Sequence, residues 1–532
     1  MTGTDPLHCP GSSTTHWTTD NVGEAMPGVA SPLGWSIWES GSDPANREMF
    51  FRIGILTRAE RDCGGPITEP VIRIFLGRIA MCMEWLGTVG DRMPGTTGPD
   101  AITGVLGRVP DTMTFTPTRR RYPIIAAKMP IAARRAIREM RALSEPTKEW
   151  WKRSVSAVAT ADEATARATL IDGATRYRHL VTQQGLVLFA ATTPVTHALT
   201  VLVARAGVGD LGTLSGTGGA EMRIVEDLWR ASRGEIGIDE VVAEHGYHGP
   251  LEGEVASRVW REDPEPLRRM VVAYAERGDD EDPIAHNAQL RAQLPQMQRE
   301  VIRALPRTHR AAARAILTLA TRTLPMRGVG KAAFVQSLDV TRAAARRLGR
   351  LYSDAGRLDD PEDIFYLTLA ELRSGLPSDA RDLVATRRGR REDYRRIRLP
   401  HSWRGTPDPV DADTCRAAIG DVISGVAASG GQVEGTVRIV TDPSFAEVEP
   451  GEILVSHTTD PSWASIMFVS AALVVDIGGI VSHAAVVARE LGIPAVVNTR
   501  HGTELLRDGD RVRVDGAAGT VELLERVSMP VG

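Results

Sequence analysis

The hydrophobic pattern of this 532-residue chain changes its period near residue 400, and that change divides the fold. Before it, apolar residues recur at helical spacing, as in "PIAARRAIREMRAL", where Ile131, Ala136 and Met140 share one face and arginines occupy the rest. A helix with one apolar face has to bury that face against other elements. The first part of the chain therefore predicts a mainly helical body, with Pro194 as a kink or break in one long helix.

Beyond residue 424, short apolar runs alternate with turns, which is the pattern of β-strands. One helix stands among them, from about Ser482 to Leu491, with Gly492 as its C-cap and Pro494 beyond it. This part predicts a small α/β domain of the β/β/α kind. Its predicted strands are "VEGTVRIV", "EILVSH", "ALVVDI", "PAVVNT", "RVRVD" and "TVELL".

The segments that join these parts are rich in residues that break regular structure. "PHSWRGTPDPVDAD" is typical of a linker, and "SGVAASGGQ" adds a second joint made of small residues. The predicted organisation is multidomain, with a mostly α-helical domain followed by the small α/β domain. The flexible N-terminus, the helical domain, the linker region and the α/β domain are predicted at 1–20, 21–400, 401–424 and 425–528.

Composition excludes several classes of protein. A net charge of -4 with a pI near 6.3 gives no electrostatic reason to bind nucleic acid or an anionic membrane. The 4 cysteines lack CxxC spacing, so neither a zinc site nor a disulfide framework is indicated. The N-terminus lacks the pattern of a secretory signal, and no run of about eighteen uninterrupted apolar residues predicts a membrane span. We therefore expect a soluble, cytoplasmic protein.

The stretch "GGIVSHAAVVARELGIPAVV" places His483 at the start of the helix in the α/β domain. Most histidines have a core or capping role, but the N–H groups and dipole at a helix start also attract an anion. Gly478 and Gly479 let the backbone pass close to a bound group. The neighbouring histidines, His457 and His501, do not give metal-ligand spacing. A histidine at a metal-free anion site suits a nucleophile that accepts and releases a phosphoryl group.

The same stretch resembles the phosphohistidine motif of the PEP-utilising enzyme family, which includes phosphoenolpyruvate synthase, pyruvate phosphate dikinase and rifampicin phosphotransferase. The likeness spans about residues 425–526, including "EPGEILVSHTTDPSWA" and "LRDGDRVRVDGAAGTVELL". It implies a swivelling domain in which His483 is the phosphorylated residue. Val475 and Val481 stand where threonine is common, which removes hydroxyl contacts but not the nucleophile. The supporting residues that the resemblance implies are Gly478, Gly479, Ser482, Arg489, Thr459 and Asp460.

The helical part resembles the acceptor-binding domain of one member, rifampicin phosphotransferase, over most of its length. The likeness rests on "NVGEAMPGVASPLGW", "GDLGTLSGTGGAEM", "HGYHGPLEGEVASRVWREDPEPL" and "GRLDDPEDIFYLTLAEL". The family usually carries His-Arg where this chain has Tyr247 and His248. His248, Glu252 and Glu254 are candidates for an acceptor-side base or orienting group, with a purely structural loop as the alternative. The loop "SGTGGAE" is either a plain turn or a phosphate cradle.

The resemblance also implies a phosphoryl donor site outside this sequence. Family members that use ATP begin with an ATP-grasp domain, whereas only a short segment precedes "NVGEAMPG" here, and "RGVGKAAF" lacks the spacing of a P-loop. We expect ATP and Mg²⁺ on a separate ATP-grasp partner, with no tightly bound cofactor and no metal on this chain. In the family, ATP ends as AMP and phosphate. This divided arrangement resembles that of phenylphosphate synthase.

The leading hypothesis is one component of a phosphotransferase of the dikinase type. His483 would pass the phosphoryl group to an apolar alcohol or phenol in the helical domain, where Trp35, Trp38 and Trp85 favour such an acceptor. Two separate sites cannot both lie within about 3 Å of one imidazole, so the domain has to swing. The alternatives are a dehydratase that phosphorylates an alcohol in order to eliminate phosphate, and a non-catalytic ligand-binding relative.

Overall fold

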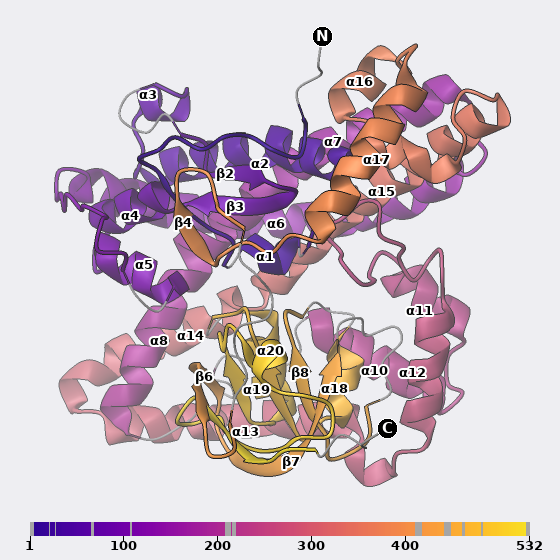
Figure 1. Cartoon of the computed structure of the whole chain (residues 1–532). Helices are drawn as coiled ribbons and strands as arrows, with labels where there is room; N and C mark the ends of the chain where they lie inside the picture. Colours follow the sequence, from indigo (N-terminus) through magenta and orange to yellow (C-terminus); the bar gives the residue numbers. More distant parts are fainter. Residues whose placement is uncertain are drawn as a thin grey trace. The chain divides into compact units, whose positions relative to one another are not determined.

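The chain forms two compact units, each built from several segments of the sequence (Figure 1). The first unit comprises Met1–Thr193, Leu251–Ser257 and Val329–Ala412, and the second comprises Pro194–Pro250, Arg258–Gly328 and Asp413–Gly532. The region predicted as one helical domain therefore contributes to both units. The computed structural model describes residues 5–20, 22–26, 28–64, 69–106, 109–207, 214, 220–409, 418–440, 448–459, 463–479 and 482–527.

Three long helices form the centre of the first unit: α2 (Pro32–Ile53) packs against both α6 (Tyr122–Val158) and α7 (Glu163–Leu186). The start of α2 follows from its sequence, because the Ser31 side chain accepts a hydrogen bond from the N–H of Gly34. The helix ends at Gly54, whose φ of 102° is left-handed.

The tryptophans expected to offer apolar surface to an acceptor lie in the core of this unit instead. Trp35 and Trp38 of α2 and Trp85 of α4 (Met83–Arg92) are 3%, 8% and 2% exposed. The indole N–H groups of Trp38 and Trp85 donate to the carbonyl oxygens of Gly253 and Glu69. These side chains stabilise the unit and leave little surface for a ligand.

The first unit also holds a small antiparallel sheet in the order β2-β3-β1-β4. Its edge strand β4 (Ser402–Arg404) lies within the region predicted as a linker and pairs with β1 (His16–Thr18). The remaining elements of the unit are α1 (Val22–Ala25), α3 (Arg58–Arg61), β2 (Ile72–Phe75), β3 (Arg78–Cys82), α5 (Gly98–Leu106), the π-helix Val187–Thr192, α15 (Met326–Asp354), the 3₁₀-helix Pro361–Tyr366, α16 (Leu369–Ser374) and α17 (Ala380–Arg395).

A π-helical turn precedes the predicted break at Pro194. Residues 187–192 form this turn, and α8 (Thr193–Ala206) continues the helix beyond it, so the proline is accommodated without ending the run. By length and composition alone, the run Glu163–Ala206 would pass as a membrane span, although the sequence pattern predicted none. The core helix of a globular protein passes the same test, and 44% of the most apolar window is buried.

The second unit contains an eight-stranded sheet in the order β5-β12-β11-β7-β8-β9-β10-β6. Strands β7 to β10 run parallel to one another, and the outer pairs are antiparallel. All six predicted strands are present, as β7 (Gln432–Val440), β8 (Ile453–Ser456), β9 (Ala472–Val475), β10 (Ala495–Val497), β11 (Arg511–Asp515) and β12 (Thr520–Glu525).

The stretch "SGVAASGGQ", predicted as a flexible joint, forms regular structure instead. Residues Val426–Ser429 are strand β6, which pairs with β10, and β5 (Val422–Ser424) pairs with β12. Its small residues serve close packing: a Cβ on Gly425 would lie 2.6 Å from the carbonyl oxygen of Val497. The joint that the sequence placed here is therefore part of the sheet.

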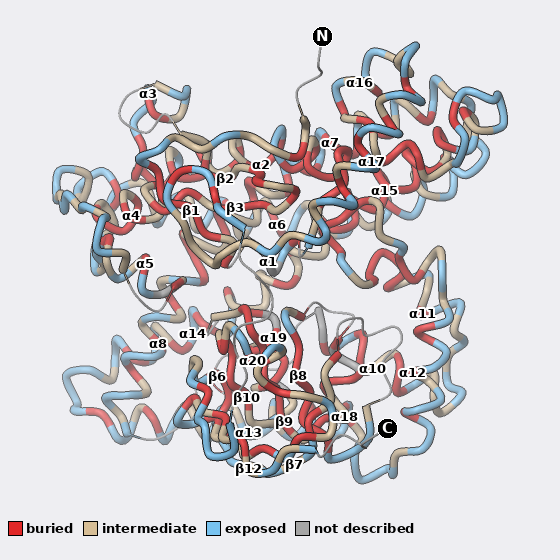
Figure 2. Tube along the Cα trace, in the orientation of Figure 1, coloured by how far each residue is buried: buried red, intermediate tan, exposed pale blue. Residues whose placement is uncertain are grey.

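The parallel strands are buried on both faces and read as red segments in Figure 2. Leu454, Leu473 and Val497 face a cluster that includes α18 (Ala464–Val469), α19 (His483–Leu491) and α10 (Ala220–Ser232). Among the described residues, the other helices of the unit are α8, α11 (Ile238–His245), α12 (Glu265–Ala275), α13 (Pro283–Ala304), α14 (Arg310–Thr323), α20 (Gly502–Leu505) and the 3₁₀-helices Asp279–Glu281 and Arg307–His309. The predicted fold class, a mostly helical part followed by a small α/β domain, is confirmed.

Candidate functional site

His483 is the first residue of α19, and the serine before it supplies the helix cap. Ser482 has extended backbone angles, and its Oγ accepts a hydrogen bond from the N–H of Ala485 at 3.3 Å. The helix ends at Gly492 in the left-handed conformation, as the sequence predicted. Since Ser482 caps the helix, the histidine is not needed for that role, and its backbone lies where the helix dipole favours an anion.

The start of α19 lies at the edge where the parallel strands β8, β9 and β10 have their carboxyl ends, because α19 connects β9 to β10 (Figure 1). Backbone hydrogen bonds join the segments that follow β8 and β9. The N–H of Asp476 donates to the carbonyl oxygen of Ser456 at 3.0 Å, and the N–H of Ile477 donates to that of His457 at 2.9 Å. Ligands of open α/β sheets bind at this edge. The geometry of the domain therefore supports an anion site at His483.

Gly478 lies against the helix cap. A Cβ at Gly478 would lie 3.0 Å from Ser482 Oγ and 3.4 Å from Val497 Cβ, so the loop packs there only because the side chain is absent. At Gly479, no heavy atom lies within 4 Å of an added Cβ. The two glycines thus differ: the first is required by packing, and the second leaves open space beside the helix start.

Three hydroxyl side chains lie at the end of β8 and directly after it. Ser456 Oγ is buried and Thr458 Oγ1 is inaccessible to solvent, and neither has a hydrogen-bond partner among the described residues. Thr459, a predicted supporting residue, is 5% exposed. Buried hydroxyls normally pair, so these groups are suited to the oxygens of a bound anion or to water. The predicted supporting residue Asp460 lies outside the described residues.

Arg489 lies on α19 itself. Its Nε donates to the carbonyl oxygen of Ala485 at 2.7 Å, which holds the side chain along its own helix. Its support of His483 stays a prediction.

Asp476 is a buried carboxylate that sequence reasoning missed. It is 1% exposed, accepts hydrogen bonds from the hydroxyls of Thr499 and Thr503, and lies 3.5 Å from His457 Nδ1. Burial raises the pKa of Asp476, but His457 and the two threonine hydroxyls outweigh burial and lower that pKa below its ordinary value. The signal was available, because Asp476 and Ser456 are polar residues that end or directly follow buried strands.

The structure places the predicted acceptor-side residues in different units: His248 in the second, and Glu252 and Glu254 in the first. The His248 ring is buried, with its centroid 4.1 Å from that of Tyr247. Glu252 is 5% exposed and lies 3.3 Å from Lys331 Nζ. The roles of His248 and Glu252 toward an acceptor stay predictions.

Glu254 holds the start of α2. Its Oε2 accepts from the N–H of Ser31 at 2.7 Å, and its Oε1 accepts from Ser31 Oγ at 2.7 Å and from the N–H of Ala256 at 2.8 Å. Arg342 of α15 donates to the carbonyl oxygens of Glu252 and Glu254 at 3.3 and 3.1 Å. These contacts give Glu254 a structural role, and its role toward an acceptor stays a prediction.

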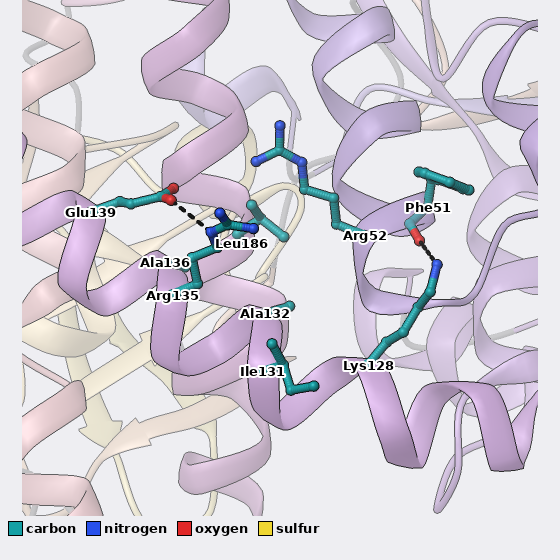
Figure 3. A pocket seen from close by; sticks show the side chains of 9 residues that line it. All are labelled: Phe51, Arg52, Lys128, Ile131, Ala132, Arg135, Ala136, Glu139 and Leu186. Carbon is teal, nitrogen blue, oxygen red and sulfur yellow. Dashed lines mark hydrogen bonds and ion pairs between the residues drawn. The ribbon is translucent and has the colours of Figure 1, made fainter.

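A pocket of about 230 Å³ lies in the first unit, lined by residues of α2, α6 and α7 (Figure 3). Its apolar wall comprises Phe51, Ile131, Ala132, Ala136 and Leu186. The sequence pattern placed Ile131 on a buried helix face, but the side chain is 68% exposed. The exposed isoleucine therefore adds apolar surface to the wall of the pocket.

Charged side chains surround this apolar wall (Figure 3). Arg135 lies 3.0 Å from Glu139, and Arg52 lies 2.7 Å from Glu48. Lys128 Nζ lies 4.5 Å from the centroid of the Phe51 ring and 3.5 Å from the Phe51 carbonyl oxygen. Each arginine has a carboxylate partner, and Lys128 forms no described ion pair. The pocket therefore combines apolar surface with three cationic head groups, two of which are paired with carboxylates.

The fold places a histidine at a glycine-preceded helix start, at the carboxyl edge of the parallel strands of an α/β domain. Two family models match the chain: the mobile domain of PEP-utilising enzymes at residues 448–519, and the fourth domain of rifampicin phosphotransferase at residues 221–328. These matches confirm the predicted resemblance to PEP-utilising enzymes at residues 448–519 and to rifampicin phosphotransferase at residues 221–328, whereas the divided arrangement of donor and carrier stays a prediction.

Several relatives share this similarity. The chain is 37% identical over 286 residues to an uncharacterised protein of Mycobacterium tuberculosis, covering 53% of this chain and 31% of the relative. It is 36% identical over 193 residues to an uncharacterised phosphotransferase of Bacillus subtilis, covering 34% and 23%. It is 37% identical over 185 residues to rifampicin phosphotransferase of Streptomyces sviceus, covering 34% and 21%. The chain thus spans less than a third of the length of these relatives.

Gly478→Ala is expected to slow phosphorylation of His483 about tenfold or more, because the new Cβ displaces Ser482 and with it the start of α19. The matched control is Gly492→Ala at the other end of the same helix. There φ is 71°, so alanine costs about 1 kcal/mol of stability but leaves the helix start in place. Equal phosphorylation rates for the two variants would contradict the packing role of Gly478.

Proposed function

We propose that this chain is the phosphoryl-carrying component of a phosphotransferase and that His483 is the carrier. The observation behind this proposal is the position of the His483 backbone at the start of α19, behind Gly478 and at the carboxyl edge of parallel strands. An imidazole there is nucleophilic near neutral pH, and the helix dipole favours the anion that it receives. The match to the mobile domain of PEP-utilising enzymes supports the same assignment.

The phosphoryl group is proposed to come from ATP on a separate ATP-grasp protein with Mg²⁺. In this step His483 attacks the β-phosphorus of ATP, an N–P bond forms, and the bond from that phosphorus to the oxygen of the leaving AMP breaks. Water then cleaves the bond between the β- and γ-phosphoryl groups, which releases phosphate and leaves one phosphoryl group on His483. The support for this donor is the family resemblance together with the lack of a P-loop motif in the 532 residues. A separate donor site requires the carrier domain to move between donor and acceptor.

The acceptor is proposed to be an organic alcohol or phenol with an apolar body. The pocket lined by α2, α6 and α7 is suited to it, because its wall is apolar and Lys128 offers a cation to a polar group on the ligand. The phosphoryl group would pass from His483 to the acceptor hydroxyl, whose proton goes to a base. His248 and Glu252, the candidates from the sequence, do not line this pocket, so their role as that base depends on where the acceptor hydroxyl lies.

A dehydratase that eliminates the transferred phosphate remains the second proposal. It shares the carrier step and differs only in the fate of the phosphate, so product analysis separates the two: a phosphate ester supports transfer, and free phosphate with an alkene supports elimination.

The isolated chain is expected to bind Mg-ATP no more tightly than about 1 mM, because the donor site is proposed to lie on the partner. Titration calorimetry of the chain with Mg-ATP measures this directly, with an ATP-grasp protein as the positive control. Binding of one equivalent in the low-micromolar range would show that this chain has a nucleotide site of its own and would contradict the divided arrangement.

A further inference from the structure

A second histidine lies at the same edge of the sheet as His483. His457 directly follows β8, and its carbonyl oxygen accepts a hydrogen bond from the N–H of Ile477 at 2.9 Å. Ile477 precedes Gly478, the glycine that packs against the Ser482 cap of α19. The His457 side chain is 54% exposed, so it is available to a group that arrives from solvent. The motif that identified His483 assigned no role to His457.

Asp476 positions His457. Its carboxylate is 1% exposed and is held by the hydroxyls of Thr499 and Thr503. A buried carboxylate requires a counter-charge, and the ion pair that the structure describes for Asp476 is with His457 Nδ1 at 3.5 Å. The pairing uses the Nδ1 side of the ring and leaves Nε2 available to an incoming group.

We propose that His457, held by Asp476, is a positioning residue that attracts and orients the phosphoryl group taken up by His483. This inference rests on the proposed carrier function. The incoming group carries negative charge, and an imidazolium at the same edge provides a charge-assisted hydrogen bond to one of its oxygens. The hydroxyls of Ser456 and Thr458, which flank His457 in sequence and have no partner among the described residues, add further polar groups at that edge.

The neighbouring histidine supplies a matched control. His501 is 47% exposed and belongs to the same domain, but its Nδ1 lies 3.0 Å from Glu504, the residue three positions along the chain. Its described ion pair is therefore with a surface carboxylate and not with the buried Asp476. Replacement of His501 removes one exposed histidine of the same domain and keeps the described ion pair between His457 and Asp476.

The test uses phosphoramidate, a small anionic donor that phosphorylates histidine without a partner protein. Four forms of the full chain are compared: wild type, His457→Gln, His457→Lys and His501→Gln. His457→Gln is expected to slow charging of His483 about tenfold, because the electrostatic attraction of the donor is lost. His457→Lys is expected to recover most of the rate, and His501→Gln to match wild type. Higher salt should slow wild type more than His457→Gln.

The outcomes separate this inference from the proposed function. If wild type is not charged at His483, the carrier function itself fails. If wild type is charged and His457→Gln is charged equally fast, only the role of His457 fails. If His457→Lys is as slow as His457→Gln, the cationic role is overturned. His457→Gln also removes the described ion-pair partner of the buried Asp476, so thermal unfolding of each variant is measured, and charging rates are compared at a temperature where all four forms are folded.

Discussion

His483→Ala is expected to reduce phosphoryl uptake to the uncatalysed background while leaving the fold intact. The proposed nucleophile is lost, and the alanine at the first position of α19 cannot accept a phosphoryl group. Stability should change by no more than about 1 kcal/mol, because Ser482 still caps the helix and alanine is a good helix former. The measurement is the amount of acid-labile, base-stable phosphate on the protein after incubation with phosphoramidate, or with ATP and an ATP-grasp partner.

The control for this prediction is His501→Ala in the same domain. His501 is half exposed like His457 and lies outside the helix start, so its loss should leave uptake unchanged. Wild-type levels of acid-labile phosphate on His483→Ala would remove His483 from the mechanism. Equal loss in both variants would point to a general effect on the domain instead.

Asp339→Ala is expected to destabilise the first unit by about 3–5 kcal/mol, the largest stability effect predicted for this chain. Asp339 and Arg342 are both 0% exposed, and their side chains lie 3.2 Å apart. Asp339 also accepts a hydrogen bond from the indole N–H of Trp151 at 2.7 Å. Removing the carboxylate takes a counter-charge away from a fully buried arginine, and Arg342 also holds the backbone at Glu252 and Glu254.

Chemical denaturation measures this effect, and an exposed pair on α7 provides the control. Asp172 and Arg176 lie 2.9 Å apart with side chains 48% and 46% exposed, so Asp172→Ala should cost less than about 1 kcal/mol. We predict that the loss in free energy of unfolding is larger for the buried pair than for the exposed pair. Similar losses of stability in the two variants would mean that another group stabilises the charge of Arg342 when Asp339 is removed.

The C-terminal domain could be predicted in detail because its signals are local. Buried parallel strands give continuous apolar runs. The start of α19 at Ser482 and its end at Gly492 are each set by a few residues that are close together in sequence. Strand β6 was missed for a physical reason. The small residues suggested flexibility, but the chain packs closely there: a Cβ on Gly425, just before the strand, would lie 2.6 Å from the carbonyl oxygen of Val497, and one on Gly516 would lie 1.9 Å from that of Ser429.

The helical part was harder to predict because its packing depends on long-range contacts. Periodicity placed Ile131 on a buried face, yet it lines an open pocket, and Trp35 is in the core rather than beside a ligand. The contact of Glu254 with Ser31 joins residues more than 200 positions apart, which no local pattern reveals. The pairing of His457 with Asp476 likewise depends on the order of the strands, since the two residues meet only when β8 and β9 are neighbours.

The most direct test of the account is to locate the phosphate after the chain has been incubated with ATP and a lysate of its own cells. The protein is recovered and digested at alkaline pH, where phosphohistidine survives, and the peptides are fragmented by electron transfer. The account predicts phosphate on His483, in the peptide that contains "GGIVSHAAVVAR", and none on His457 or His501. Phosphate on another residue with His483 unmodified would contradict the carrier assignment and, with it, the proposed function.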